Sequence, residues 1–241
     1  MKILVLGGTG EARLLANRLV ALGHHVTSSL AGRTSEPRLT KGDVRVGGFG
    51  GIWGLAAYLR AGEFDRLVDA THPYAGLISV NAVAAARETG LPLLRLMRPA
   101  WVEPEGVHWL RVPDVHAAVQ ALPGGAMVML TTGHGGLDHF LKRDDCRLLV
   151  RLIEPPQEIL PAYAKLLLDR PPFTLEGEMA LMEQEAVTHL VSKNSGGSQT
   201  AAKLEAAERL NIAVIMIDRP DYQAAEEVGS VDEAIAALHL P

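Results

Sequence analysis

The sequence predicts an α/β protein of two Rossmann-like, doubly wound domains, with mostly parallel sheets and a cleft between the domains. Three observations favour this fold class. The chain has 241 residues, which suits one large domain or two small ones. Short β-branched runs alternate with longer helical patterns, as they do in βα units. The alternation stops between Arg98 and Pro113 and then restarts, which indicates a crossover between two similar halves.

The first domain is expected to span residues 1–100 and to bind NADP. Residues 3–6 form an apolar run typical of a buried strand, and glycines follow it. Apolar residues between Ala12 and Leu22 then recur at helical spacing, and Gly23 stands where helices commonly end. The other strands are predicted at 26–30, 44–46, 66–70 and 91–96, and the other helices at 54–61 and 77–89.

The second domain is expected to span residues 113–241 and to complete the substrate cleft. Its predicted strands are 127–131, 148–153, 189–192 and 213–217, and its predicted helices are 115–122, 137–142, 199–210 and 231–238. Prolines at 155, 156 and 161 indicate the start of a further helix.

The composition excludes several classes of protein. With 48% hydrophobic and 21% charged residues, the chain is neither disordered nor fibrous. No apolar run approaches the ~20 residues that span a bilayer, and the N-terminal apolar run is too short for a signal peptide. We therefore expect a soluble, cytoplasmic protein without a membrane partner. A formal net charge of −5 argues against a nucleic-acid partner.

Metal and nucleophilic chemistry find little support in the sequence. The single cysteine, Cys146, can form neither an internal disulfide nor, alone, a zinc site. It follows a charged run without a glycine turn, which disfavours a role as nucleophile. The nine histidines form no H-x-x-x-H or H-E-x-x-H pair, and the chain lacks a G-x-S-x-G elbow and a Walker A sequence. We expect no metal.

The first motif with chemical meaning is a glycine turn directly after the first predicted strand. Glycines allow a phosphate to approach the backbone closely, and the helix N-terminus that follows supplies N–H donors. The spacing departs from G-x-G-x-x-G, because Ala12 or Arg13 stands where the third glycine of the motif would be. A purely structural βα turn therefore stays possible. The predicted cofactor-binding residues are Gly7, Gly8, Thr9, Gly10 and Glu11.

The second predicted strand indicates which nicotinamide cofactor is used. In NAD sites this strand usually ends in an acid that binds the ribose 2′-hydroxyl. Here Ser29 lies at its end and Arg33 follows, with no acid between them. Hydroxyls and a guanidinium suit a 2′-phosphate, so NADP is favoured over NAD. The alternative is that Arg33 is only an exposed loop residue.

Polar residues crowd the end of the fourth predicted strand, where ligands of open α/β sheets bind. Asp69, Thr71 and His72 are predicted to bind the cofactor, and Tyr74 to bind substrate. The structural alternative is that Asp69 caps the turn and Pro73 ends the strand.

Two glycine-rich turns in the second half could receive anionic groups of a substrate. Lys193, Asn194, Ser195 and Gly196 follow one predicted strand and precede a helix, an arrangement that favours anion binding. Thr131 begins the matching turn after an earlier strand. The alternatives are a helix cap at Ser195, a solvated Lys193 and a tight turn after Thr131.

Taken together, these residues resemble the precorrin-6A reductases of cobalamin biosynthesis. The resemblance extends over nearly the whole chain, in the order expected for that family. The blocks that carry it are 7–13, 29–33, 47–51, 69–74, 193–197 and 218–220, and Leu93–Leu96 with Arg98, Pro99 and Trp101.

The resemblance implies NADPH-dependent reduction of one carbon–carbon double bond of precorrin-6A, giving precorrin-6B. Related enzymes of the anaerobic route act on the cobalt-containing ring, and this substrate stays open as an alternative. The ring carries many carboxylates, so cations near the strand ends are candidate ligands. We expect Arg95, Arg98, Arg151 and Lys193 to bind substrate, with Arg219 a further candidate. If a side chain supplies the proton, His72 and Lys193 are the candidates. Transient contact with neighbouring pathway enzymes is also expected.

Two other functions compete with this one. Short-chain reductases need a Tyr-x-x-x-Lys pair, but each of the four tyrosines lacks a lysine four residues later. A non-catalytic NADP-sensing protein would use the same glycine turn and stays open.

Overall fold

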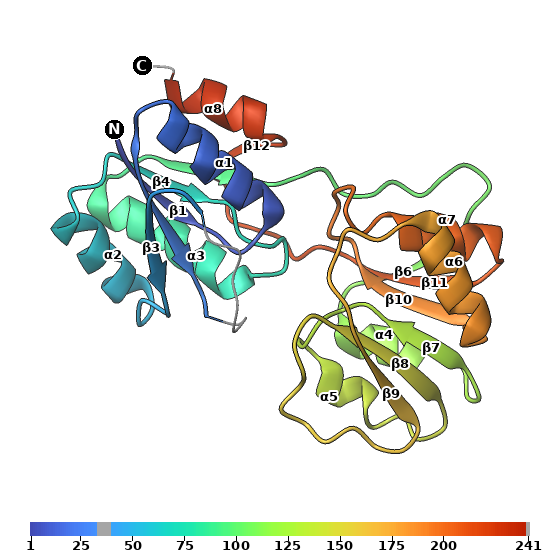
Figure 1. Cartoon of the computed structure of the whole chain (residues 1–241). Coiled ribbons are helices and arrows are strands. Elements are labelled where there is room, and N and C mark those ends of the chain that lie inside the picture. The colour runs from blue at the N-terminus through green and yellow to red at the C-terminus, as the bar shows by residue number, and fades with distance from the viewer. Residues whose placement is uncertain (33–39, 240–241) are drawn as a thin grey trace. The chain divides into compact units, whose positions relative to one another are not determined.

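The computed structural model describes residues 1–32 and 40–239 and divides the chain into two compact units (Figure 1). Unit 1 consists of residues 1–99 together with the chain from Pro220 onward, and unit 2 consists of Ala100–Arg219. Each unit contains a six-stranded sheet in which every described pairing is parallel. The predicted α/β class with two parallel-sheet domains is confirmed.

The sheet of unit 1 has the order β12-β5-β4-β1-β2-β3. Its strands are β1 (Lys2–Leu6), β2 (His25–Leu30), β3 (Asp43–Val46), β4 (Arg66–Asp69), β5 (Leu93–Leu96) and β12 (Glu226–Val228). The chain order reverses beside β1, because β2 and β3 lie on one side of it and β4 and β5 on the other. Such a switch point opens a crevice at the carboxyl ends of the strands.

Helices cover both faces of this sheet. The helices of unit 1 are α1 (Gly10–Ala21), α2 (Ile52–Ala61), α3 (Gly76–Thr89) and α8 (Val231–His239). Buried residues of α1 and α8, such as Leu15 and Ala234, pack on one face. Buried residues of α2 and α3, such as Leu55 and Ala82, pack on the other. The apolar residues of β1 alternate between these two cores, as expected for a strand buried on both faces.

The sheet of unit 2 has the order β6-β11-β10-β7-β8-β9. Its strands are β6 (Trp109–Val112), β7 (Met127–Leu130), β8 (Arg147–Leu152), β9 (Ala164–Leu168), β10 (His189–Lys193) and β11 (Ala213–Ile217). Its helices are α4 (Val115–Ala121), α5 (Leu137–Phe140), α6 (Leu175–Gln184) and α7 (Ala202–Arg209). The order reverses beside β7, so β7 and β10 flank the switch point of this sheet.

The C-terminal segment belongs with unit 1, whereas the sequence-based division placed it in the second domain. The physical reason is strand pairing: Glu226–Val228 runs parallel to Leu94–Leu96 and extends the first sheet. The helix that follows buries Val231, Ala234 and Leu238 in the core beneath α1. Unit 2 is thus inserted between β5 and β12.

Two further local expectations differ from the structure. The prolines at 155, 156 and 161 do not begin a helix, because residues 155–161 form a loop that leads into β9. The next helix, α6, begins later, where the Thr174 side chain caps its first turn by accepting from the Gly177 N–H. Within the expected crossover, Trp109–Val112 forms β6 and pairs with β11.

Residues 1–32 and 40–239 contain neither a membrane-spanning helix nor a cluster of metal ligands. In these ranges, no helix has both the length and the apolar composition needed to cross a membrane. The same residues contain no cluster of three or more His, Cys, Asp or Glu side chains that could hold a metal ion.

Candidate functional site

The glycine turn connects β1 to α1 at the switch point of unit 1. Gly8 has φ of 113°, a conformation that glycine adopts without strain. The Thr9 hydroxyl accepts from the Ala12 N–H at 3.0 Å and donates to the Ala70 carbonyl at 2.9 Å. Thr9 therefore caps the helix and ties the turn to the end of β4. The resulting N-terminus of a 12-residue helix is suited to a phosphate.

Glu11 and Arg98 form an ion pair at 2.8 Å, although the sequence assigned them to cofactor and substrate respectively. Glu11 lies in the first turn of α1 and Arg98 follows β5, so the pair joins the glycine turn to the end of the fifth strand. Both side chains are partly buried. The arginine thereby neutralises the acid beside the site expected for a phosphate.

Arg45 is a further candidate residue, which the sequence pattern did not indicate. It projects from β3, and its Nη1 donates to the Ser29 hydroxyl at 3.2 Å and to the Gly47 carbonyl at 2.7 Å. Its Nη2 donates to the Gly48 carbonyl at 2.7 Å. The guanidinium also stacks on Phe49, 3.8 Å from the ring centroid. A cation is thus fixed at the end of β2. Arg33, the residue predicted for this role, lies outside the described residues.

The end of β4 carries a buried polar chain. The Asp69 Oδ1 accepts from the Thr71 hydroxyl at 2.7 Å and from its N–H at 3.2 Å. The Thr71 hydroxyl lies 3.4 Å from that of Ser79 on α3. On the other side, Arg95 Nε lies 3.6 Å from Asp69 Oδ2. Both residues are only 2% exposed, so the two opposite charges compensate each other in the interior of unit 1.

Arg95 is therefore buried inside unit 1, where its side chain is not accessible to a large substrate. Its guanidinium lies over the Tyr222 ring, 5.0 Å from the centroid, and donates to the Gln223 carbonyl at 3.2 Å. It anchors the C-terminal segment over the Asp69 carboxylate. Asp69 in turn fixes Thr71 and the β4–α3 loop (residues 70–75).

His72 and Tyr74 lie in this loop. The His72 Nδ1 accepts from the Tyr74 N–H at 3.2 Å, so a neutral His72 ring carries its proton on Nε2. The ring centroids of the two residues are 5.8 Å apart. His72 is exposed and Tyr74 half-buried. This places a titratable ring beside the switch point.

In unit 2, Lys193 at the end of β10 reaches the turn that follows β7. Its Nζ donates to the Thr132 carbonyl at 2.7 Å and to the Gly135 carbonyl at 3.4 Å. The Thr131 hydroxyl donates to the Val191 carbonyl at 3.0 Å. The structure thus brings together the two glycine-rich turns of unit 2, with the ammonium of Lys193 between them.

The β10–α7 loop (residues 194–201) has a role that the sequence did not reveal. Asn194 is 3% exposed; its side chain accepts from the Trp101 N–H at 2.8 Å and donates to the Trp101 carbonyl at 3.1 Å. Arg219 donates to the carbonyls of Asn194 and Ser195 at 2.8 and 3.0 Å. The side chain of Asn194 thus binds the protein's own backbone. Gly196, also in this loop, is buried and has φ of 68°.

Arg151 does not join the other candidate residues. It forms a two-contact ion pair with Glu178, and the second contact, from Nη2 to Oε2, measures 3.1 Å. The guanidinium also packs on Phe173, 3.9 Å from the ring centroid. Arg151 is 7% exposed and Glu178 is 3% exposed. The charge of Arg151 is compensated inside unit 2, which gives it a structural role.

Burial alters two titratable groups of unit 2. Burial raises the pKa of the Cys146 thiol above its usual value, which agrees with the expectation that it is no nucleophile. Burial lowers the pKa of His189 at the start of β10.

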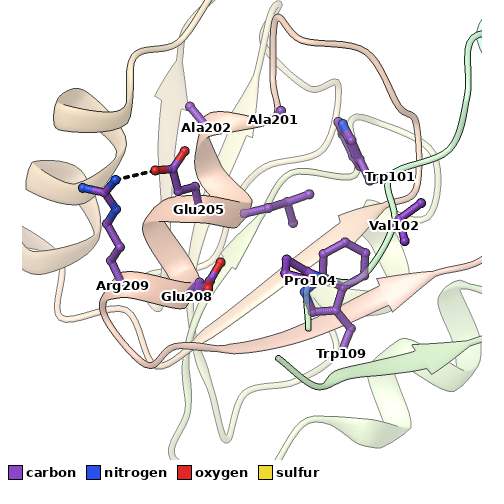
Figure 2. A pocket seen from close by; sticks show the side chains of 10 residues that line it. Trp101, Val102, Pro104, Trp109, Ala201, Ala202, Glu205, Glu208 and Arg209 are labelled. Carbon is purple, nitrogen blue, oxygen red and sulfur yellow. Dashed lines mark hydrogen bonds and ion pairs between the residues drawn. The ribbon is translucent and has the colours of Figure 1, made fainter. Parts of the chain in front are cut away.

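A surface groove of about 550 Å³ lies between α7 and the segment that precedes β6. Figure 2 shows Trp101, Pro104 and Trp109 on one side of it and the ion pair of Glu205 with Arg209 on the other. None of the residues predicted to bind cofactor or substrate lines this groove.

Comparison with known proteins identifies the family. Residues 2–239 match the family described as "Precorrin-6x reductase CbiJ/CobK". The chain is 47% identical to a precorrin-6A reductase of Rhodococcus erythropolis over 98% of this chain and 96% of the relative. It is 30% identical to a cobalt-precorrin-6A reductase of Priestia megaterium over 98% and 97% of the two chains.

A solved structure supports the same conclusion. The structure described as "CobK precorrin-6A reductase" matches with a TM-score of 0.93 and 41% identity, covering 98% of this chain and 95% of that one. The chain therefore belongs to the precorrin-6x reductase family CbiJ/CobK, an oxidoreductase family whose reaction implies a reduced nicotinamide cofactor.

Proposed function

We propose that the protein reduces one carbon–carbon double bond of precorrin-6A to give precorrin-6B, with NADPH as the hydride donor. A hydride is added to one ring carbon and a proton to its neighbour, so that precorrin-6A, NADPH and a proton give precorrin-6B and NADP⁺.

The observation that carries this proposal is the pattern of identity to relatives. Relatives named precorrin-6A reductase share 42–47% of their residues with this chain. Relatives named cobalt-precorrin-6A reductase share 29–31%. Both groups align over nearly the whole chain, so the difference does not reflect partial matches. It favours the cobalt-free ring as the substrate.

The preference for NADPH is supported by Arg45 and Ser29. A guanidinium has five N–H donors in a fixed plane, and three hydrogen bonds hold that of Arg45 at the end of β2. A 2′-phosphate at this position would meet a preoriented cation and a hydroxyl, which form charge-assisted hydrogen bonds. Arg33 remains a second candidate for the same phosphate.

The glycine turn would hold the pyrophosphate. The N-terminal N–H groups of α1 and the φ of 113° at Gly8 allow close approach of an anion. The Glu11–Arg98 pair compensates the one acid in the first turn of α1. Bound NADPH supplies the hydride, and the protein contributes binding, orientation and electrostatics.

Three residues are proposed to act on the substrate and its proton. Lys193 presents its ammonium between two glycine-rich turns, where it would bind a carboxylate of the ring. Tyr74 would pack against the ring, and His72 is the proposed proton donor, acting in its protonated imidazolium form. Thr131, Ser195 and Gly196 remain proposed contacts through their loops.

The test is anaerobic incubation of the purified protein with precorrin-6A and NADPH, followed by NADPH absorbance and macrocycle mass. The proposal requires one NADPH oxidised for each ring that gains two hydrogen atoms. A parallel incubation with the cobalt-containing ring, at matched concentration, measures the preference between substrates. Faster turnover of the cobalt ring would overturn the assignment of substrate. Tight NADPH binding without turnover of either ring would favour a sensing protein instead.

A further inference from the structure

The chain passes between the two units twice, and each passage is held at both ends. The outgoing passage leaves unit 1 after Pro99 and the return passage leaves unit 2 after Arg219. On the outgoing passage, Arg98 pairs with Glu11 in unit 1. Three residues later, Trp101 exchanges two hydrogen bonds with Asn194 and donates from its indole to the Gly197 carbonyl at 2.9 Å in unit 2.

The return passage repeats this pattern. Arg219 donates to the carbonyls of Asn194 and Ser195 in unit 2. Three residues later, the Tyr222 hydroxyl donates to the Pro73 carbonyl in unit 1, and Arg95 holds the next residue through the Gln223 carbonyl. Asn194 therefore contacts both passages, one through its side chain and the other through its carbonyl.

Only two residues separate the anchors of each passage, namely Pro99–Ala100 and Pro220–Asp221. All four are exposed, and within the described residues they form no hydrogen bond or ion pair. Three Cα–Cα steps reach at most roughly 11 Å. Each proline fixes its own φ and restricts the arginine before it to extended conformations. Each span is therefore short and restricted in conformation.

The groups that these anchors bind lie in candidate site loops of their own unit. Glu11 lies in the glycine turn, Pro73 in the β4–α3 loop, and Asn194, Ser195 and Gly197 in the β10–α7 loop. A displacement at one end of a short span is therefore passed to a site loop at its other end. Contacts that only held the passages in place could be made anywhere in each unit, whereas these contacts are made to candidate site loops in both units.

We propose that Arg219 and Tyr222 are positioning residues for the reduction. Through Pro220–Asp221 they couple the β10–α7 loop of unit 2 to the β4–α3 loop of unit 1. The outgoing passage couples the β10–α7 loop to the glycine turn in the same way. This inference rests on the proposed function for its effect on turnover, but the coupling itself is a property of the chain.

The sharpest test inserts two glycines between Pro220 and Asp221, which leaves every anchor intact and adds slack. The expected result is a loss of kcat of tenfold or more, while the Kd for NADPH and the thermal midpoint of each unit stay within experimental error. The matched control inserts two glycines between Gln157 and Glu158, two exposed residues of a unit 2 loop. A kcat that is the same in both insertion variants would overturn the proposal.

A second measurement separates this inference from the proposed function. Arg219→Lys keeps the charge but loses the planar fork that reaches two carbonyls, and Tyr222→Phe removes only the hydroxyl. Amide hydrogen exchange of residues 70–75 should accelerate severalfold in both variants. With the two glycines inserted, Arg219→Lys should no longer affect residues 70–75. If Arg219→Lys alters exchange only within unit 2, the loops are not coupled, whatever the turnover of the wild type.

Discussion

Arg45 donates a 3.2 Å hydrogen bond to the hydroxyl of Ser29, which joins the edge strand β3 to the end of β2. The same guanidinium rests on Phe49 and lies 5.1 Å from the ring centroid of Tyr58. An arginine supported by two aromatic rings loses less conformational entropy on meeting an anion. The end of β2 thereby holds a cation in a fixed orientation before any ligand arrives.

Replacing Arg45 by methionine should reduce the preference for NADPH over NADH. A hydrogen bond to a charged group contributes about 1.5–3 kcal/mol, so we expect the ratio of the two kcat/KM values to fall by roughly 10- to 150-fold. Steady-state kinetics with both cofactors measure this ratio. Arg60→Met is the matched control, because Arg60 pairs with Glu88 on the surface of the same unit. An unchanged ratio in Arg45→Met would remove Arg45 from the cofactor site.

Lys193→Met should impair turnover and leave NADPH binding intact. The ammonium lies in unit 2, whereas the proposed cofactor residues lie in unit 1. We expect kcat/KM for precorrin-6A to fall at least tenfold, with the Kd for NADPH within twofold of wild type. Lys165→Met serves as control, since Lys165 is an exposed residue of β9 that forms an ion pair with Glu185. Equal kinetics in the two variants would contradict a role of Lys193 in substrate binding.

Breaking the pair of Arg151 and Glu178 should destabilise unit 2. Removing one partner leaves an uncompensated buried charge, which costs about 3–5 kcal/mol. We expect Arg151→Met alone to lower the free energy of unfolding by this amount in urea titrations. The double variant Arg151→Met with Glu178→Leu should recover most of the loss, because both charges are removed. A double variant as unstable as the single one would show that the pair itself is strongly stabilising.

Unit 2 should lose stability on acidification partly through His189. Burial lowers the pKa of this residue below its ordinary value of 6.5, so the unfolded chain takes up a proton first as the pH falls. The contribution of neutral His189 is therefore complete above pH 6.5 and decreases as the pH falls through the folded-state value. In His189→Gln this decrease should be absent. Urea titrations between about pH 5 and 8 compare the two slopes, and identical slopes would exclude His189 as a source.

The periodic, buried elements were predictable from the sequence; of the edge strands, β3 was predicted, whereas β6, β9 and β12 were not. The five strands and three helices expected in the first hundred residues are present. β12 escaped prediction because its residues, Glu-Glu-Val, are mostly exposed and carry no such pattern. β9 was missed because prolines precede it and suggested a helix.

For the candidate site, the sequence located the loops but not the partners within them. Asp69 and Lys193 could be chosen as candidates because each lies at the carboxyl end of a predicted strand, where ligands of parallel sheets bind. Glu11 and Arg98 are 87 positions apart, so no local sequence pattern indicates that they form an ion pair. Arg45 was missed for a similar reason: its strand alternates poorly, and its neighbour Ser29 lies on a different strand.

The insertion of unit 2 between β5 and β12 also dictates the order in which the molecule can be assembled during synthesis. The 120 or so residues of unit 2 emerge from the ribosome as one continuous piece and can fold as soon as they are released. Unit 1 is completed later, because the residues that cover Leu94 and Leu96 are translated after unit 2. A nascent chain stalled before Glu226 would hold an unpaired strand edge and an uncovered apolar face, the features that recruit chaperones.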